Sequence, residues 1–181
     1  MKKHSQCLRW LNDEKASIAA EAGIFIPILF SMLVAVFFFF SAILVNQKAI
    51  NASQMTADLI AREISVNDQQ VEDAMDAARQ AMLPLNLTNF GVAIASVQYN
   101  AENEPEILWQ DVTGTAEEFE VEDAPIQGTI GLGGEGDGMV VVQVTYEYDP
   151  VFSGSFLPTI MMREVSYTRG RRLPVVTRID G

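Results

Sequence analysis

The chain has 181 residues, 24 acidic against 12 basic, and a formal net charge of -12. This acidic excess opposes binding to nucleic acid or to an anionic lipid surface, so we expect protein partners and no nucleic acid. The only histidine, His4, and the only cysteine, Cys7, lie near the N-terminus, so the rest of the sequence lacks a Ser-His-Asp triad, a His- or Cys-based metal site and a disulfide.

Residues 1–16 form a short basic segment, which we predict to be a polar, partly disordered cytoplasmic leader. Positive charge beside a membrane span favours the cytoplasmic side, so the acidic remainder is expected on the other side of the membrane. The leader has four basic residues against two acidic ones, namely Lys2, Lys3, Arg9 and Lys15 against Asp13 and Glu14.

Residues 17–45 are expected to form a transmembrane helix. No residue from Ala22 to Val45 is charged, and ~24 residues at ~1.5 Å each give ~36 Å, enough to cross a hydrocarbon core of ~30 Å. The apolar part of an ordinary secretory signal is shorter. Glu21, at the start of the run, is either an interface residue or a functional one, because an unpaired carboxylate there is costly. Pro27 is either a benign kink or a hinge.

The start of the apolar run reads AAEAGIFIPILF, with Pro27 six residues after Glu21. A basic leader, small residues, this Glu and a long apolar helix resemble a type IV prepilin-type signal, and within that group the TadE/TadG-like pseudopilins of the tight-adherence (Tad) pilus. The resemblance implies that a prepilin peptidase cleaves between Ala16 and Ser17. Ala16 stands where the family usually has Gly, and Ala22 where it commonly has an aromatic residue.

The resemblance implies a structural protein that catalyses nothing and uses no cofactor or metal: a minor pseudopilin-like component of a Tad-type pilus or related secretion apparatus. It would lie in the inner membrane, with its N-terminus in the cytoplasm and its C-terminal part in the periplasm. Its partners would be other pilins or pseudopilins and inner-membrane Tad assembly proteins. Glu21 would pair with the free N-terminal amine of a neighbouring subunit.

Two alternatives remain open. One is an unprocessed single-pass membrane protein whose extracytoplasmic domain binds a ligand or a protein. The other is a membrane-anchored hydrolase, which would have to depend on carboxylates alone.

Residues 46–83 are expected to form an extracytoplasmic helical region. The stretch Asn46–Val66 has no Gly or Pro and repeats apolar residues at helical spacing. We therefore predict that the span continues as one helix from Ser17 to Val66. Asp58 and Arg62 are placed four residues apart, which favours an ion pair on its polar side.

A second helix is predicted to follow, with Asn67-Asp68 at its N-terminus, because Asn is a preferred N-cap residue. Pro84 marks its end. Its apolar positions recur at helical spacing: Val71, Ala74, Met75, Ala78 and Met82.

Residues 84–181 are expected to form an extracytoplasmic α+β region with an antiparallel sheet, because the hydrophobic period changes to two. The resemblance implies that this sheet is pilin-like. The strand ending at Asp149-Pro150 is the strongest, and its sequence VTYEYDPVF is similar to an aromatic-rich strand of TadE-like proteins. Phe156–Met162 is expected to be helix or loop, and Val175–Gly181 to be frayed. The predicted strands are Phe90–Tyr99, Glu106–Val112, Val140–Tyr148, a weaker Phe119–Val121 and a final Arg163–Tyr167.

Charge is unevenly distributed in this region. Nine acidic residues and no Lys or Arg lie from Glu102 to Asp123. Opposite charges can meet within one chain, which we favour, or between subunits, where Arg171 and Arg172 are the candidate contacts. The basic residues near the C-terminus are Arg163, Arg169, Arg171, Arg172 and Arg178.

Two further patterns suggest sites but are better interpreted as loops. The acidic pairs Glu117-Glu118 and Glu122-Asp123 fit a solvated loop better than a glycosidase site. The glycine-rich stretch Gly128–Gly138 lacks the Lys of a phosphate-binding loop. We predict a flexible connection there, with an adventitious Ca²⁺ site at Glu135 and Asp137 as the alternative.

Overall fold

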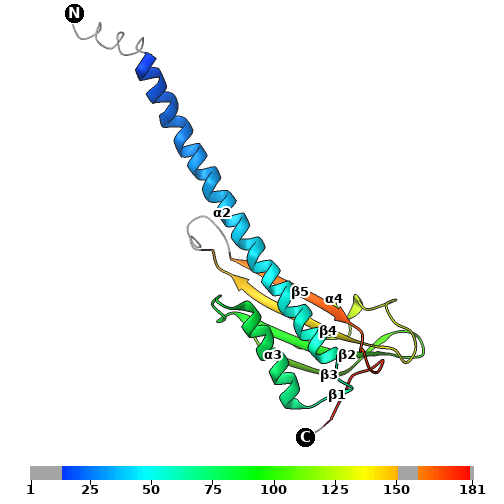
Figure 1. Cartoon of the computed structure of the whole chain (residues 1–181). Coiled ribbons are helices and arrows are strands. Elements are labelled where there is room, and N and C mark those ends of the chain that lie inside the picture. Colours follow the sequence, from blue (N-terminus) through cyan, green and yellow to red (C-terminus); the bar gives the residue numbers. More distant parts are fainter. Residues whose placement is uncertain (1–13, 151–158, 180–181) are drawn as a thin grey trace, which may run out of the picture. The chain divides into compact units, whose positions relative to one another are not determined.

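The computed structural model describes residues 14–150 and 159–179 (Figure 1). The chain divides into two units, the first ending at Ala42 and the second beginning at Ile43. Helix α2, Glu14–Ala61, continues from the first unit into the second. The prediction of one long helix is confirmed, but its predicted end at Val66 is wrong, because Ser65–Val66 form the short strand β1.

The second helix, α3, spans Asp68–Met82 and begins as predicted. Asn67 Oδ1 accepts a hydrogen bond of 2.9 Å from the backbone N–H of Gln70, and Gln70 Oε1 accepts one of 3.0 Å from the backbone N–H of Asn67. This reciprocal pair satisfies two backbone donors at the helix start. The predicted apolar face is buried: Val71, Ala74, Met75, Ala78 and Met82.

Four antiparallel strands form the main sheet, in the order β3-β2-β4-β5. Two predictions were wrong. Phe119–Val121 is not a strand, and Met161 and Met162 belong to a strand rather than to a helix or loop; residues 156–158 lie outside the described part. The strands are β2 Phe90–Tyr99, β3 Pro105–Gly114, β4 Gly138–Tyr148 and β5 Ile160–Thr168.

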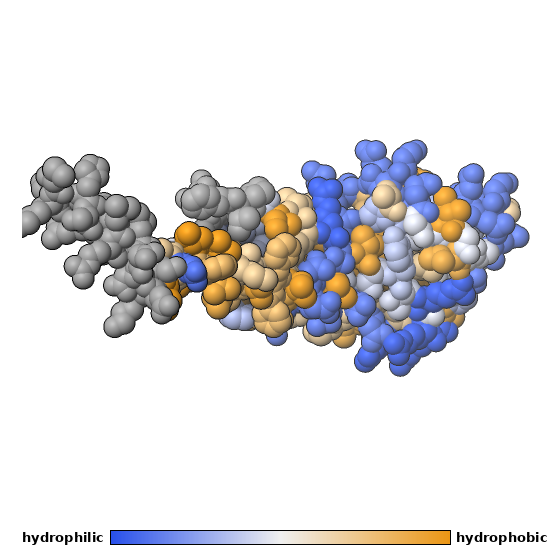
Figure 2. All heavy atoms as spheres, turned by 90° about the horizontal axis from the view of Figure 1, so that it is seen from above, coloured by the Kyte–Doolittle hydropathy of each residue, from blue (hydrophilic) through white to orange (hydrophobic). Residues whose placement is uncertain are grey.

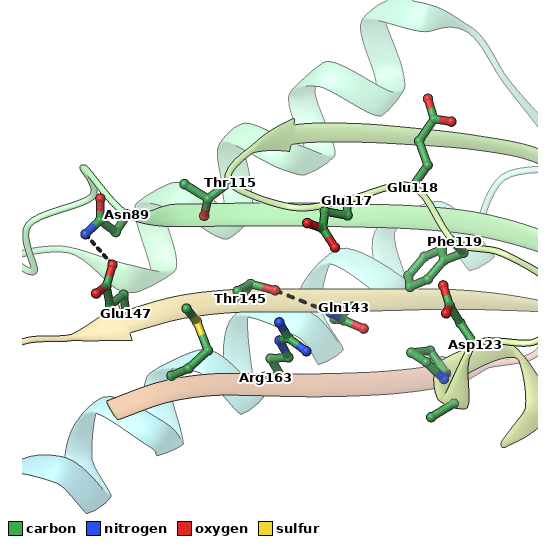
Figure 3. Close-up of a pocket in the computed structure, with 13 residues that line it drawn as sticks. Asn89, Thr115, Glu117, Glu118, Phe119, Asp123, Gln143, Thr145, Glu147 and Arg163 are labelled. Carbon is green, nitrogen blue, oxygen red and sulfur yellow. Dashed lines mark hydrogen bonds between the residues drawn. The ribbon is translucent and has the colours of Figure 1, made fainter. Parts of the chain in front are cut away.

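Helices α2 and α3 cover one face of this sheet, as two opposite views show (Figures 1 and 3). Small side chains on α2 allow close packing, and Thr56 Oγ1 donates a hydrogen bond of 3.3 Å to the Ala74 carbonyl of α3. The buried residues of this layer include Ala49, Ala52 and Ile60 of α2, Val92 and Ile94 of β2, and Val140, Val142 and Val144 of β4.

The connection from β3 to β4 covers part of the other face. Phe119, with its side chain in the core rather than in a strand, and Ile126 of the short helix α4, Ala124–Gln127, pack on β2 and β4. The sheet is therefore buried on both sides along much of β2 and β4, which explains the three consecutive valines, Val140–Val142, in β4. The strand residues in this second core are Ala93, Ala95, Val97 and Val141.

The C-terminal segment is ordered by pairing, so the prediction that Val175–Gly181 is frayed is wrong for its described residues. Strand β6, Thr177–Arg178, pairs in parallel with β1. The carbonyl of Val176, a residue only 1% exposed, accepts hydrogen bonds of 2.8 Å from both Ser96 Oγ and Trp109 Nε1.

The glycine-rich connection is also held in place by specific contacts. Tyr99 donates its hydroxyl to the Thr129 carbonyl at 2.7 Å, and its ring lies so close to Gly133 that a Cβ there would clash at 2.2 Å. The Asp137 carboxylate accepts a hydrogen bond of 3.1 Å from the backbone N–H of Gly134. The predicted connection is therefore present, but it is shaped by these contacts.

Candidate functional site

The first unit presents an apolar helix with exposed side chains (Figure 2). Among the described residues, Ala20–Ala61 is the one helix that is long and apolar enough to cross a membrane. Phe30 and Leu33 are each 67% exposed and Phe39 is 74% exposed. An apolar surface of this extent is unfavourable in water at roughly 25 cal/mol per Å² and marks an interaction with lipid or with another protein.

The two predicted assembly residues, Glu21 and Pro27, both lie on α2 in this unit. Glu21 is exposed on the helix surface. Pro27 lies inside the helix, and because proline has no N–H, the carbonyl of Gly23, four residues earlier, loses its helical donor. The helix continues through Pro27 to Ala61, so both the kink and the hinge interpretations remain predictions.

The predicted processing site lies in the first turn of α2. The helix begins at Glu14, so Ala16 and Ser17 are both helical. The last residues of the predicted leader 1–16 therefore have helical backbone, and residues 1–13 lie outside the described part. Cleavage between Ala16 and Ser17 remains a prediction.

Lys48, which directly follows the charge-free run on α2, contacts the C-terminal end of helix α3. Lys48 is the first charged residue after Glu21. Its Nζ donates a hydrogen bond of 2.6 Å to the carbonyl of Leu83, the C-cap residue of α3. A cation at this position also interacts favourably with the negative end of the helix dipole.

Arg171 is paired within the chain. Asp58 on α2 accepts hydrogen bonds from both Arg171 and Arg62, and the Arg62 bond confirms the predicted i,i+4 ion pair. These contacts, the hydrogen bond from Arg62 above all, lower the pKa of Asp58 below its usual value. Arg171 thus joins the C-terminal segment to α2.

The other C-terminal arginines differ in their contacts. Arg178 Nη2 lies 2.7 Å from Asp68 Oδ1 and 3.2 Å from Asp111 Oδ2. The hydrogen bonds that Arg178 donates to Asp68 are the main cause that raises the pKa of Arg178. Asp111, one of the acidic residues between Glu102 and Asp123, therefore pairs with the C-terminal Arg178 within the chain, which is the alternative that we favoured from the sequence. Arg172 is exposed and makes no ion pair with any described residue.

A polar hollow of about 410 Å³ lies on the sheet face opposite the helices, beside the connection that covers the second core (Figure 3). Arg163 and Glu117 point into it, while Glu118 points away. Two hydrogen bonds fix part of its floor, 2.6 Å from Asn89 Nδ2 to Glu147 Oε2 and 3.3 Å from Gln143 Nε2 to Thr145 Oγ1.

This hollow holds one cation and several carboxylates, among them Asp123, but no nucleophile paired with a histidine base. Asp123 Oδ2 already accepts a hydrogen bond of 2.8 Å from the backbone N–H of Glu120. Within residues 14–150 and 159–179, no group of three or more His, Cys, Asp or Glu side chains could hold a metal ion. The arrangement is suited to polar contacts with a ligand or partner.

Comparison of the chain with protein-family models, with curated proteins and with solved structures found no match.

Sequence reasoning missed three of the features described above. The Lys48–Leu83 contact and the two donors to the Val176 carbonyl join residues far apart in the chain, and no local pattern signals them. Arg163 was counted only as one of a C-terminal group of arginines, although its position within a predicted strand was a signal that it would occupy a sheet face.

Proposed function

We propose that this protein is a membrane-anchored, minor pseudopilin-like structural component of a Tad-type pilus or a related secretion apparatus. The apolar part of α2 would cross the inner membrane with the N-terminus in the cytoplasm, and the sheet unit would lie in the periplasm. Its partners would be other pilins or pseudopilins, inner-membrane Tad assembly proteins and a prepilin peptidase. The protein itself would catalyse nothing and require no cofactor.

One observation carries this proposal: an exposed carboxylate, Glu21, directly precedes the charge-free helical run Ala22–Gln47, and the same helix continues into a folded α+β unit. A span that served only as an anchor would gain nothing from a carboxylate near the hydrocarbon region, where an unpaired charge costs about 2.5–3.5 kcal/mol at a helix centre and less near the interface. A charged partner on a neighbouring subunit would offset this cost.

A free α-amine is a suitable partner for this carboxylate. Cleavage between Ala16 and Ser17 would create one, and in a medium of low dielectric constant the attraction between a carboxylate and an ammonium group is much stronger than in water. The amine of one subunit and Glu21 of its neighbour would then pair on assembly, so that neither charge remains alone in the membrane. Glu21 lies near the N-terminus, outside the sheet unit. This position fits pairing with an amine of another subunit better than it fits an ion pair within the sheet unit.

The test is Glu21→Gln in the host, with Glu72→Gln as the matched control, because Glu72 is an exposed glutamate on α3, outside the apolar run. We expect the Glu21 variant to remain in the membrane fraction at the level of the unaltered protein but to be lost from pili or from complexes isolated with its partners. The Glu72 variant should behave as the unaltered protein. Normal incorporation of the Glu21 variant would contradict the proposal and favour an unprocessed membrane protein with a binding domain.

A further inference from the structure

The depth of one part of the sheet unit follows from the position of Lys48. The run Ala22–Gln47 contains no charged residue, and Lys48 directly follows it on the same helix. At ~1.5 Å per residue this run is ~39 Å long, somewhat more than the ~30 Å of a hydrocarbon core. If the run spans the membrane, the ammonium group of Lys48 lies at the lipid–water interface, where lysine side chains are favoured.

Leu83 lies at the same depth, because Lys48 Nζ donates its 2.6 Å hydrogen bond to the Leu83 carbonyl. The Leu83 side chain is 54% exposed. It begins a connection to β2 that also carries Leu85 and Leu87 and has no charged residue before the strand. An exposed leucine is held here beside a lysine that marks the membrane surface.

Two more exposed apolar side chains lie at this end of the sheet. Asn89, at the start of β2, donates a hydrogen bond to Glu147 of β4, and Glu147 is paired in register with Met161 of β5. Met161 is 54% exposed and its neighbour Ile160 is 43% exposed. Ile160 and Met161 point to opposite faces of β5, and Met161 borders the polar hollow, so the two side chains flank the end of the sheet at which β2 begins.

We infer that Leu83, Ile160 and Met161 form a lipid-facing rim, through which the sheet unit rests on the outer surface of the bilayer. The inference depends on the proposed membrane anchor. Lipid is the occupant that the position of Lys48 favours, because any exposed group held at that depth meets the interfacial layer first. Glu147, the acidic residue paired in register with Met161, accepts a hydrogen bond from Asn89.

The experiment uses the full chain in phosphatidylcholine vesicles, with an environment-sensitive NBD label on single cysteines in a Cys7→Ser background, since Cys7 is the only native cysteine. Leu83→Cys and Met161→Cys report on the rim. Phe39→Cys reports on the span. Leu173→Cys is the matched control, because Leu173 is also exposed, at 46%, but belongs to the segment that packs near Gly138, at the other end of β4.

We expect spin-labelled lipid to quench the labels at residues 39, 83 and 161 but not the one at 173, and aqueous iodide to quench the label at 173 several-fold more than those at 83 and 161. If the labels at 83 and 161 behave like the one at 173 while the label at 39 is quenched by lipid, the rim is wrong and the anchor stands. If lipid does not quench the label at 39, the anchor and the rim are both wrong. Unchanged circular dichroism shows that each variant is folded.

Discussion

The indole N–H of Trp109 donates a hydrogen bond of 2.8 Å to the carbonyl of Val176, 67 residues further along the chain. Ser96, the cross-strand neighbour of Trp109, donates a second one to the same oxygen. Two strands of the sheet therefore hold the C-terminal segment through one buried acceptor. This contact places β6 beside β1.

Removing these donors should destabilise the protein in a non-additive way. Trp109→Phe and Ser96→Ala each leave one donor in place, so we expect each to lower the free energy of unfolding by about 0.5–1.5 kcal/mol for the lost hydrogen bond, with the loss of indole packing added for the tryptophan. The double variant leaves the buried carbonyl with neither donor, which should cost more than the sum. Urea unfolding of the detergent-solubilised chain, followed by circular dichroism, measures all three. Strictly additive losses would show that the two hydrogen bonds contribute independently and would contradict this coupling through one shared acceptor.

The capping box of α3 offers a second stability test. Asn67→Ala removes the side-chain oxygen that accepts from the backbone N–H of Gln70 and keeps the backbone N–H that donates to Gln70 Oε1, and we expect a loss of about 0.5–2 kcal/mol. Asn67→Asp keeps the acceptor oxygen and adds a negative charge at a helix N-terminus, so its stability should equal or exceed that of the unaltered protein. The same urea unfolding experiment distinguishes them. Equal losses in both variants would mean that the side-chain hydrogen bond is not what stabilises the helix start.

The Asp58 ion pairs predict a specific pH dependence. Because the hydrogen bond from Arg62 lowers the pKa of Asp58 from its usual 3.8, the stabilisation is present above that value and is lost as the pH falls through the lower folded-state pKa. Asp58→Asn removes this titration. The difference in stability between the unaltered protein and the Asn variant should therefore shrink below about pH 4 and stay constant from pH 5 to 8. A difference that is the same at pH 3 and pH 7 would contradict the assignment.

Variants of the adjacent residues Arg171 and Arg172 can distinguish a charge contact within the chain from one between subunits. Arg171→Glu places a like charge against Asp58, so we expect it to destabilise the folded unit. Arg172 has no ion-pair partner among the described residues, and Arg172→Glu should leave the melting temperature unchanged. If Arg172 makes a subunit contact, its reversal will reduce co-isolation of partner subunits from membranes. Unchanged co-isolation would rule out this contact, and a lower melting temperature would show that Arg172 stabilises the fold instead.

The elements with strong local signals could be predicted from the sequence. The helix α3, its Asn67 cap and its buried face follow from a 3.6-residue period and a capping residue. Strand β2 was predicted at its observed bounds, Phe90–Tyr99, because a short run of apolar residues lies between polar turns. The candidate span could also be predicted, because the length and apolar composition of the charge-free run before Lys48 are local properties of the sequence.

The features that depend on distant partners could not be predicted. The segment around Val176 has no strong period, and it is ordered because Ser96 and Trp109 donate to its backbone and β1 supplies a parallel partner. Phe119 is apolar like a strand residue, but it fills the second core from a loop. The functional role of Glu21 is beyond what packing can show, because its proposed partner belongs to another chain.

The most direct test of the proposed function is the intact mass and N-terminal sequence of the protein recovered from the membranes of its host, with and without an active prepilin peptidase. We expect a chain that begins at Ser17 only when the peptidase is active, which would supply the free amine that Glu21 requires. A chain that begins at Met1 under both conditions would contradict the pseudopilin proposal and leave Glu21 as an interface residue of an uncleaved membrane protein.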